Sequence, residues 1–424
     1  MLAIATGGGK TKTALISSSE IQNLTPDKPF LVVILVPSDP LVRQWKSEVQ
    51  QFGIEPIVLG DIPSTVRAGV LAEVEAAFIG SSDTTRVVLA TRQLFAADER
   101  FRSLVDRCAK YGSTMLIADE VHNFGVSSFI NDPPEAFNFR LGLSATPVRQ
   151  YDVDGTNSLF DFFGPQIFEY TLGEAIDAGC LVPYDYFIHR VELTSEEMER
   201  YRLLSEELIR AGFRVDDDGR MLVNNPKIER LLRRRRAVLE QAESKISALR
   251  EELLQTTVTR ALIYCSPKEL EVAVEKQIVL VNRLLSDLGI VSHELTSVET
   301  SAGKGPEILR RFAEGSYQAL TAMKVLDEGV DVPATEAAYI LASTTVEREW
   351  VQRRGRVLRT APGKTHAAVH DFVVIPPSGD GAGRSVLRSE LRRIRAFAEL
   401  ARNRWAVDGP VDEIESIEQL ANEG

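Results

Sequence analysis

The chain has 424 residues, of which 44% are hydrophobic and 26% are charged, and its formal net charge is −12 at pH 7. This composition is close to that of an average globular protein and excludes wholesale disorder. The acidic balance excludes a bulk attraction to nucleic acid, so any nucleic-acid contact must come from particular residues on a locally basic surface.

Signals for a membrane or for secretion are missing from the sequence. The longest apolar run, Phe30–Val36, has seven residues, whereas a membrane span needs about 20. No apolar signal segment stands at the start of the chain. Cys108, Cys180 and Cys265 lack the spacing of a zinc site or a disulfide framework. These features predict a protein of the reducing cytoplasm with no membrane partner.

Two stretches of the chain alternate short apolar runs with helical patterns. The strands predicted in the first stretch are Phe30–Val36, Arg86–Ala90, Met115–Ala118 and Arg140–Ser144. The strands predicted in the second are Ala261–Cys265, Gln318–Ala322, Ala337–Leu341 and Ala367–Val373. Each run is continuously apolar, as expected for strands that helices cover on both faces. The alternation predicts an α/β fold with two parallel-sheet domains.

A helical region of about Thr194–Thr259 separates these stretches. One long helix is predicted there from apolar residues at heptad-like spacing, which Arg235 interrupts; they are Leu232, Leu239, Ala242, Ile246, Leu249 and Leu253. After the second stretch, the Gly-rich segment Ser378–Arg384 predicts a flexible linker, followed by a basic helix of about Ser385–Arg404 and an acidic tail. The predicted domains are residues 1–190, a helical insertion at 191–258, residues 259–376, and a C-terminal helix and tail at 377–424.

A phosphate-binding loop is predicted near the start of the chain, where the sequence reads Thr6-Gly7-Gly8-Gly9-Lys10-Thr11. Glycines allow backbone N–H groups to surround a phosphate, and the helix that follows points its N-terminus at the anion. Lys10 supplies charge and Thr11 can ligate Mg²⁺. The strict pattern has Gly where this chain has Ile4. The alternative interpretation is a Gly-rich arm before a helix.

Two adjacent carboxylates, Asp119 and Glu120, follow the apolar strand Met115–Ala118. A phosphate-loop enzyme needs one carboxylate near Mg²⁺ and one to orient the attacking water. Both are best placed at the carboxyl end of a strand, although Asp-Glu after a strand is also common as a plain helix cap. The segment Ser144–Pro147 ends the next apolar strand. The order of loop, carboxylate pair and Ser-Ala-Thr is not expected by chance.

In this order the motifs resemble those of superfamily-two helicases of the DExH type. The resemblance is to the branch with the XPB-type repair helicases and the translocase subunits of type I and type III restriction enzymes, and it covers about residues 1–375. Further matching segments are Leu35–Pro37 with Leu41, Gln44 and Trp45, then Ala90–Gln93, Ile263–Cys265, Val325–Pro333, Gln352–Arg359 and the linker Phe163–Tyr184. The resemblance implies two RecA-like domains in tandem with ATP and Mg²⁺ bound between them.

The resemblance also implies roles for particular residues. Lys10 and Thr11 hold phosphate and Mg²⁺, Asp119 holds Mg²⁺ through water, and Glu120 orients the hydrolytic water. Gln352, Arg356 and Arg359 reach the γ-phosphate from the second domain, unless they belong to a solvated basic helix. The nucleotide site is completed by Thr6, Gly7, Gly8, Gly9, Gly329 and Asp331. His122, Ser144 and Thr146 couple nucleotide state to movement, although His122 can also be read as a packing residue at a helix start.

Nucleic-acid contacts are expected from two regions. By resemblance, the backbone of one strand is gripped by Pro37, Gln44, Thr91 and Gln93, and such phosphate contacts carry little sequence information. In the insertion, nine basic and five acidic residues give Lys227–Arg260 a net charge of +4. This segment predicts a contact with the DNA backbone, or else a solvated helix with internal ion pairs.

The sequence thus predicts an ATP-dependent DNA helicase or translocase, with double-stranded DNA favoured over single-stranded DNA by the resemblance. An RNA helicase shares all of these motifs, and a non-catalytic helicase-like subunit is the other alternative. No nuclease motif is visible, so any cutting needs a nuclease subunit as partner. The family's upstream adenine-reading segment has no room in the five residues before Thr6. We therefore expect a chain that is truncated, mis-started or completed by a partner protein.

Overall fold

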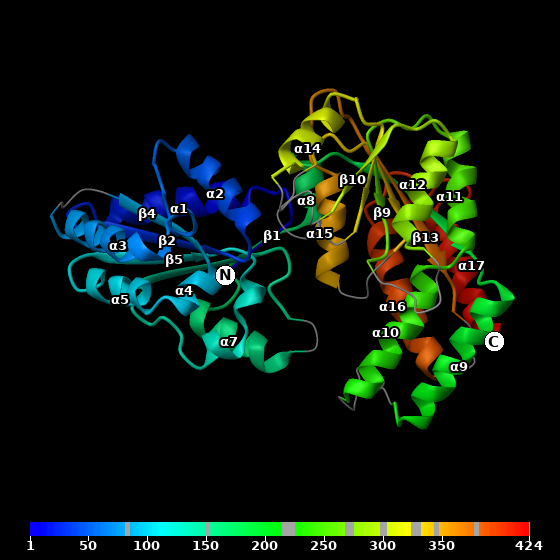
Figure 1. Cartoon of the computed structure of the whole chain (residues 1–424), viewed down its shortest axis with the longest axis horizontal. Helices are drawn as coiled ribbons and strands as arrows, with labels where there is room; N and C mark the ends of the chain where they lie inside the picture. Colours follow the sequence, from blue (N-terminus) through cyan, green and yellow to red (C-terminus); the bar gives the residue numbers. More distant parts are fainter. Residues whose placement is uncertain are drawn as a thin grey trace. The chain divides into compact units, whose positions relative to one another are not determined.

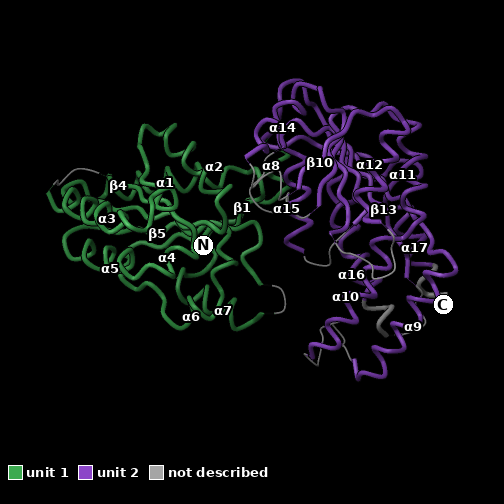
Figure 2. The backbone as a smooth tube through the Cα atoms, in the orientation of Figure 1, with its two compact units in different colours: residues 1–178, 328–330 green, residues 179–327, 331–424 purple. Residues whose placement is uncertain are grey.

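The computed structural model describes residues 1–80, 85–149, 152–213, 225–267, 275–296, 303–323, 332–342, 347–376 and 381–423. The chain forms two compact units, residues 1–178 and the described residues from 179 onward (Figure 1, Figure 2). Each unit is built on one sheet with helices packed against it. Within the described residues, no helix is both long and apolar enough to cross a membrane.

The first unit contains a seven-stranded sheet in the order β3-β4-β2-β5-β6-β1-β7. Its strands are β1 (Leu2–Ile4), β2 (Phe30–Val36), β3 (Ile57–Val58), β4 (Thr85–Thr91), β5 (Ser113–Ala118), β6 (Phe139–Ser144) and β7 (Phe168–Tyr170). Its helices are α1 (Lys10–Leu24), α2 (Asp39–Gln51), α3 (Ser64–Ile79), α4 (Arg92–Ala97), α5 (Glu99–Cys108), α6 (Ser127–Ile130), α7 (Val153–Phe163) and α8 (Leu172–Asp177). Every strand pairing is parallel.

The central strand β2 explains why the apolar runs in this unit are continuous. Its side chains alternate between two cores on opposite faces of the sheet. Leu31, Val33 and Leu35 belong to one core, which also contains residues of α3 and α5. Phe30, Val32, Ile34 and Val36 belong to the other, with Ala14 of α1 and Trp45 of α2. The whole strand is therefore buried.

The second unit contains a six-stranded sheet in the order β10-β11-β9-β12-β13-β8, and its pairings are also all parallel. Its strands are β8 (Tyr184–Val191), β9 (Ala261–Tyr264), β10 (Ser292–Leu295), β11 (Ala319–Ala322), β12 (Ala337–Ile340) and β13 (Ala367–Val374). Its helices are α9 (Ser195–Arg210), α10 (Pro226–Glu240), α11 (Ser244–Gln255), α12 (Gln277–Asp287), α14 (Gly305–Ala313), α15 (Glu347–Val357), α16 (Gly381–Ala398) and α17 (Pro410–Glu423).

The eight predicted strands are present, but several predicted boundaries need correction. The first unit ends at residue 178 rather than 190, because β8 pairs along its length with β13 of the second sheet. The single long helix of the insertion is instead two helices, α10 and α11. The break follows Glu240, whose carbonyl oxygen accepts a hydrogen bond of 2.9 Å from the Gln277 side chain, so the helix ends there although its apolar stripe continues in the same core.

The C-terminal region also differs from its prediction. Residues 378–380 of the predicted linker lie outside the described residues, and α16 begins at Gly381, before the predicted helix start. The acidic tail, for which the sequence analysis predicted no secondary structure, forms the helix α17. Its buried side chains Ile414 and Ile417 belong to a helix that packs on β8 and α16. The periodicity of apolar residues within an acidic segment accounts for this burial.

Candidate nucleotide-binding site

The predicted motifs of the first unit gather at one edge of its sheet. β1 leads into Thr6–Thr11, β5 leads into Asp119 and Glu120, and β6 ends at Ser144. Because all strands are parallel and β6 lies between β1 and β5, their carboxyl ends share this edge. Such an edge is where open α/β sheets bind ligands.

The backbone geometry of the loop requires glycine at three successive positions. Gly7 and Gly9 have φ angles of 86° and 93°, in the left-handed region that other residues avoid. A Cβ atom on Gly8 would lie 3.0 Å from the carbonyl oxygen of Ala5. Gly9 is the N-cap of α1 and gives no side-chain cap bond, so the first N–H groups of the helix are open to an anion.

Lys10 and Glu120 bring the loop and the carboxylate pair into direct contact. Lys10 Nζ lies 2.8 Å from Glu120 Oε1, and both side chains are largely buried. Glu120 adopts φ 46° and ψ 54°, a conformation that is unfavourable for a residue with a side chain. In the described residues, the buried hydroxyl of Thr6 at the start of the loop has no hydrogen-bond partner.

Asp119 is a buried carboxylate held by two hydrogen bonds. Trp45 Nε1 of α2 donates to Asp119 Oδ2 over 2.8 Å, and the Glu120 N–H donates to Asp119 Oδ1 over 2.9 Å. Burial raises the pKa of the Asp119 carboxyl, which Lys10 partly offsets. Asp119 and the hydroxyl of Thr11 offer hard oxygen ligands, the set that Mg²⁺ prefers. The Trp45 bond was missed by sequence reasoning, since it depends on how α2 packs beside β5.

The predicted coupling residues are also brought together. His122 Nδ1 lies 3.0 Å from Ser144 Oγ and 3.6 Å from Glu120 Oε2. The Thr146 N–H donates to Ser144 Oγ over 3.1 Å. Arg149, which the sequence did not single out, donates to the carbonyl oxygen of His122. Glu120 is thus linked through His122 to the end of β6.

In the second unit, α15 carries the predicted arginine motif. Gln352 and Arg356 are buried and lie four residues apart on one face of α15. Arg359 is half-buried and follows the helix, where it forms an isolated antiparallel bridge with Leu181. Arg353 and Arg354, which received no role, are structural. Arg353 donates to the Ala342 carbonyl oxygen over 2.9 Å and Arg354 donates to that of Ala396 over 2.5 Å.

Two other features concern the same motif. Lys364 Nζ donates to the carbonyl oxygens of Val357 and Arg359 over 2.6 and 2.8 Å, so it fixes the chain where α15 ends. This capping lysine was also missed by sequence reasoning, although lysine near a helix C-terminus is a general signal. The predicted site residues Gly329 and Asp331 lie outside the residues that the structure describes.

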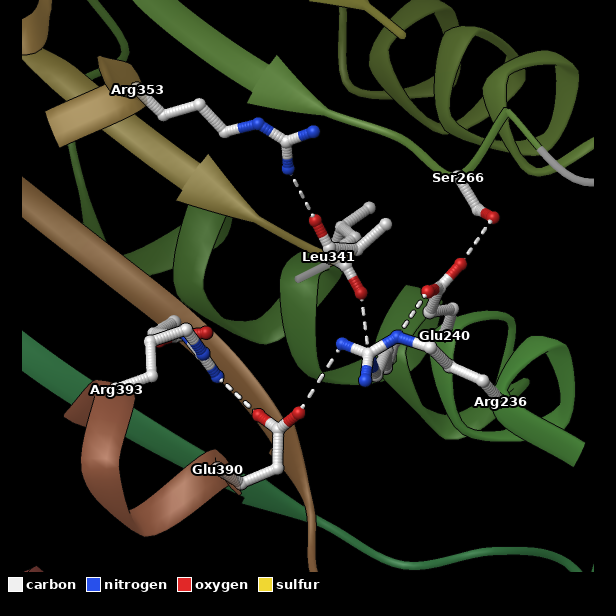
Figure 3. Close-up of polar contacts among 10 residues, drawn as sticks. Arg236, Glu240, Ser266, Leu341, Arg353, Glu390 and Arg393 are labelled. Atoms are coloured by element: carbon white, nitrogen blue, oxygen red, sulfur yellow. Dashed lines mark hydrogen bonds and ion pairs between the residues drawn. The ribbon is translucent and has the colours of Figure 1, made fainter. Parts of the chain in front are cut away.

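A buried polar network joins the insertion to the segments that follow β9 and β12 of the second sheet (Figure 3). Arg236 of α10 contacts Glu240 at 2.8 Å and Glu390 of α16 at 3.5 Å. Glu240 in turn accepts from Ser266 Oγ over 3.0 Å. Lys245 donates to the Leu341 carbonyl oxygen over 2.6 Å, next to the carbonyl that binds Arg353.

This network changes the interpretation of the basic insertion. Arg235 and Lys245 are buried, and Arg235 lies over the Tyr201 ring at 5.3 Å. Arg236 is held by ion pairs. Some of the nine cations therefore stabilise the second unit instead of facing a ligand. The exposed basic residues of α10 are Lys227, Arg230, Arg233 and Arg234.

The four predicted nucleic-acid residues lie on neighbouring elements of the first unit. Pro37 follows β2 and Thr91 ends β4, at the same sheet edge as the loop. Thr91 Oγ1 also accepts from the Leu94 N–H over 3.3 Å and so caps α4. Gln44 is half-buried in α2, and Gln93 is exposed in α4.

A phosphate-binding loop and a strand-end carboxylate pair, with a second parallel sheet downstream, define a phosphate-loop protein with two RecA-like domains. Comparison with protein families agrees. Residues 1–149 match the res subunit of type III restriction enzymes, and residues 244–361 match the helicase conserved C-terminal domain.

Individual proteins give the same result. The chain is 25% identical over 377 residues to the DNA 3'-5' translocase XPB2 of Sulfurisphaera tokodaii, covering 85% of this chain and 74% of that protein. The Hef helicase domain of Pyrococcus furiosus shares the fold with a TM-score of 0.54 and 16% identity, covering 92% of this chain and 94% of that one. The DNA-bound type ISP restriction-modification enzyme LlaBIII shares it with a TM-score of 0.59 and 17% identity, covering 93% of this chain but 28% of that enzyme.

The chain therefore carries the two domains of a superfamily-two helicase or translocase and is similar to XPB-type proteins and restriction-enzyme subunits. Members of this class are nucleic-acid-dependent ATPases.

Proposed function

We propose that this protein hydrolyses ATP to drive its movement along DNA, with duplex DNA as the preferred track. The observation that carries the proposal is the contact of Lys10 with Glu120 beside His122, because it joins the phosphate loop, the carboxylate pair and the coupling segment. Similarity to a protein named as a DNA translocase supports DNA over RNA.

The first unit supplies the groups that bind the nucleotide. The N–H groups of the loop and the Lys10 ammonium hold the phosphates, and Thr11 and Asp119 hold Mg²⁺. Magnesium, when bound, neutralises negative charge on the phosphate oxygens. Asp119 is kept in position for this by Trp45 and by the Glu120 N–H.

Glu120 is the residue that orients the attacking water. Its carboxylate is paired with Lys10 at 2.8 Å. Phosphate binding gives Lys10 a competing anionic partner, so Glu120 is released to accept a proton from water. His122 lies 3.6 Å from the same carboxylate. Through this contact it couples the state of the bound nucleotide to Ser144 and Thr146.

The second unit supplies the arginines. We assign Gln352, Arg356 and Arg359 to the γ-phosphate because an arginine delivered by a second domain stabilises the charge of the transition state. Gly329 and Asp331 are proposed to complete the nucleotide site. DNA phosphates are bound by Pro37, Gln44, Thr91 and Gln93, and by the exposed basic side of α10. A nuclease-bearing partner subunit is proposed from the match of residues 1–149 to a restriction-enzyme subunit.

The test is ATP turnover with duplex DNA, single-stranded DNA and duplex RNA of one sequence. We expect duplex DNA to stimulate turnover most, and Glu120→Gln to abolish turnover with every nucleic acid. Equal stimulation by RNA would instead support an RNA helicase. No turnover under any condition would support a non-catalytic subunit.

A further inference from the structure

Three side chains capable of binding a metal lie together in the second unit, away from the motifs described above. His189 is in β8, His370 is in the neighbouring strand β13, and Glu252 is in α11. The strands are parallel, with His189 opposite Phe372 and His370 opposite Phe187. Since side chains alternate along a strand, both imidazoles lie on one face of the sheet. That face is covered by α11, which packs on β8.

The distances within this His–His–Glu cluster fit a shared cation. His189 Nε2 lies 3.0 Å from His370 Nδ1. Glu252 Oε2 lies 3.8 Å from His189 Nε2, and Glu252 Oε1 lies 3.6 Å from His370 Nδ1. Zinc binds histidine nitrogen and carboxylate oxygen at about 2.0–2.2 Å, so its tetrahedral ligand atoms are roughly 3.3 Å apart. The observed separations lie on both sides of that value.

A hydrogen-bonded triad without metal accounts less well for the carboxylate. The two imidazoles are within hydrogen-bonding distance of each other, but Glu252 is too far from either nitrogen for a hydrogen bond. An ion at the centre attracts all three groups at once. Its ligand atoms come from three separate elements, which is why no spacing in the sequence marks them.

The surroundings hold the two imidazoles in place. His370 lies between the rings of Phe187 and Tyr339, with centroid distances of 4.9 and 4.7 Å, and His189 lies 4.7 Å from the Phe372 ring. The His189 side chain is 24% exposed and that of Glu252 17%, which leaves access for the ion and for a water as fourth ligand.

We propose that His189, His370 and Glu252 bind one divalent transition-metal ion, with Zn²⁺ as the preferred ion, and that this ion fastens α11 of the insertion to the second sheet. Two imidazoles and one carboxylate are a donor set of zinc and its first-row neighbours. Magnesium and calcium prefer sites made of oxygen ligands. The inference does not depend on the proposed ATPase function, since none of the three residues has a role in it.

The experiment uses the full chain without an affinity tag, stripped of metal with a chelator and titrated with Co²⁺ in the absence of nucleotide. Visible absorption reports tetrahedral Co²⁺, and Zn²⁺ is then added as competitor. We expect one equivalent of Co²⁺ to bind and Zn²⁺ to displace it. His189→Ala and Glu252→Gln are expected to weaken binding by more than about tenfold, since even supporting residues of metal sites contribute 10–100-fold. The control variant His366→Ala, at an exposed histidine, should bind like the wild type.

Thermal unfolding gives a second readout that does not require a spectroscopic signal. Excess Zn²⁺ should raise the Tm of the wild type and of His366→Ala, because an ion that binds the folded state stabilises it. It should raise the Tm of Glu252→Gln by less than that of the wild type, because the weakened site is less occupied at the same Zn²⁺ concentration. The proposal is overturned if the wild type binds no Co²⁺ or Zn²⁺, or if His189→Ala and Glu252→Gln bind as tightly as the wild type. His189 and Glu252 are partly exposed. Their variants therefore test the proposal even if the variant at the buried His370, His370→Ala, does not fold.

Discussion

The indole N–H of Trp45 donates a hydrogen bond of 2.8 Å to the buried carboxylate of Asp119. The two residues are far apart in the sequence and belong to α2 and the end of β5. This bond stabilises the ionised carboxylate in a place where burial raises its pKa. The proposed nucleotide site is therefore supported by a residue of the neighbouring helix.

Trp45→Phe tests this support while keeping an aromatic ring in the core. We expect the variant to lose about 1–3 kcal/mol of stability, because a buried acceptor loses its donor. We also expect it to need more Mg²⁺ for half-maximal ATP turnover, since a less ionised Asp119 is a poorer ligand. Turnover measured against Mg²⁺ concentration checks this, with Trp405→Phe as control at a side chain that is 76% exposed. An unchanged Mg²⁺ requirement would argue against a role for the bond.

Lys10→Ala and Glu120→Gln should both abolish ATP turnover but should differ in nucleotide binding. In the proposed mechanism Lys10 contacts the phosphates of bound ATP, so its loss should weaken binding. The role proposed for Glu120 is to orient the water, so its loss should leave ATP bound and uncleaved. Equilibrium binding and single-turnover hydrolysis separate the two effects. Equal ATP affinities in the two variants would contradict these roles.

The sequence predicted the central strands and the nucleotide motifs because both are local features. An uninterrupted apolar run such as Phe30–Val36 can only be a buried element, and the carboxylate pair follows its strand directly. By contrast, β8 was missed because polar and charged residues are mixed into Tyr184–Val191. Those residues contact partners from distant segments. For example, the Tyr186 hydroxyl donates a hydrogen bond of 2.8 Å to Asp371. Asp371 is also paired with Arg393.

Contacts between segments set the limit of sequence reasoning at the site as well. The motifs identified Asp119, but its hydrogen bond to Trp45 depends on the packing of α2. The positive charge of the insertion was visible in the sequence, whereas the burial of Arg235 and Lys245 was not. A net charge counts side chains without regard to which of them face solvent, so it overstated the basic surface available to DNA.

Arg356→Ala and Arg359→Ala should lower the maximal rate of ATP turnover and leave nucleotide affinity nearly unchanged. Both residues belong to the second unit, while the phosphate loop proposed to bind ATP belongs to the first. An arginine supplied from another domain is worth about 10³–10⁵ in rate in related chemistry. Nucleotide affinity and maximal rate should be measured separately, with Arg348→Ala of the same helix as control. A large affinity loss at an unchanged rate would contradict the assignment.

Lys245 gives the second unit a specific pH dependence. Burial lowers the pKa of this lysine to about 8, whereas an unfolded lysine titrates near 10.4. Between these values the unfolded state binds more protons, so the contribution of Lys245 to the free energy of unfolding increases with pH. Relative to Lys245→Met, the wild type should gain up to about 3 kcal/mol from pH 7.5 to 10.5. Urea unfolding at several pH values checks this, and a difference that does not vary with pH would contradict it.

Strand displacement from a DNA triplex tests movement along the duplex most directly. A labelled third strand is bound to a duplex far from the end where the protein loads, and its release is followed with time. We predict that release requires ATP, lags in proportion to the length of duplex to be crossed, and is abolished by Glu120→Gln. Steady ATP turnover without release, or release at the same rate without ATP, would contradict the account.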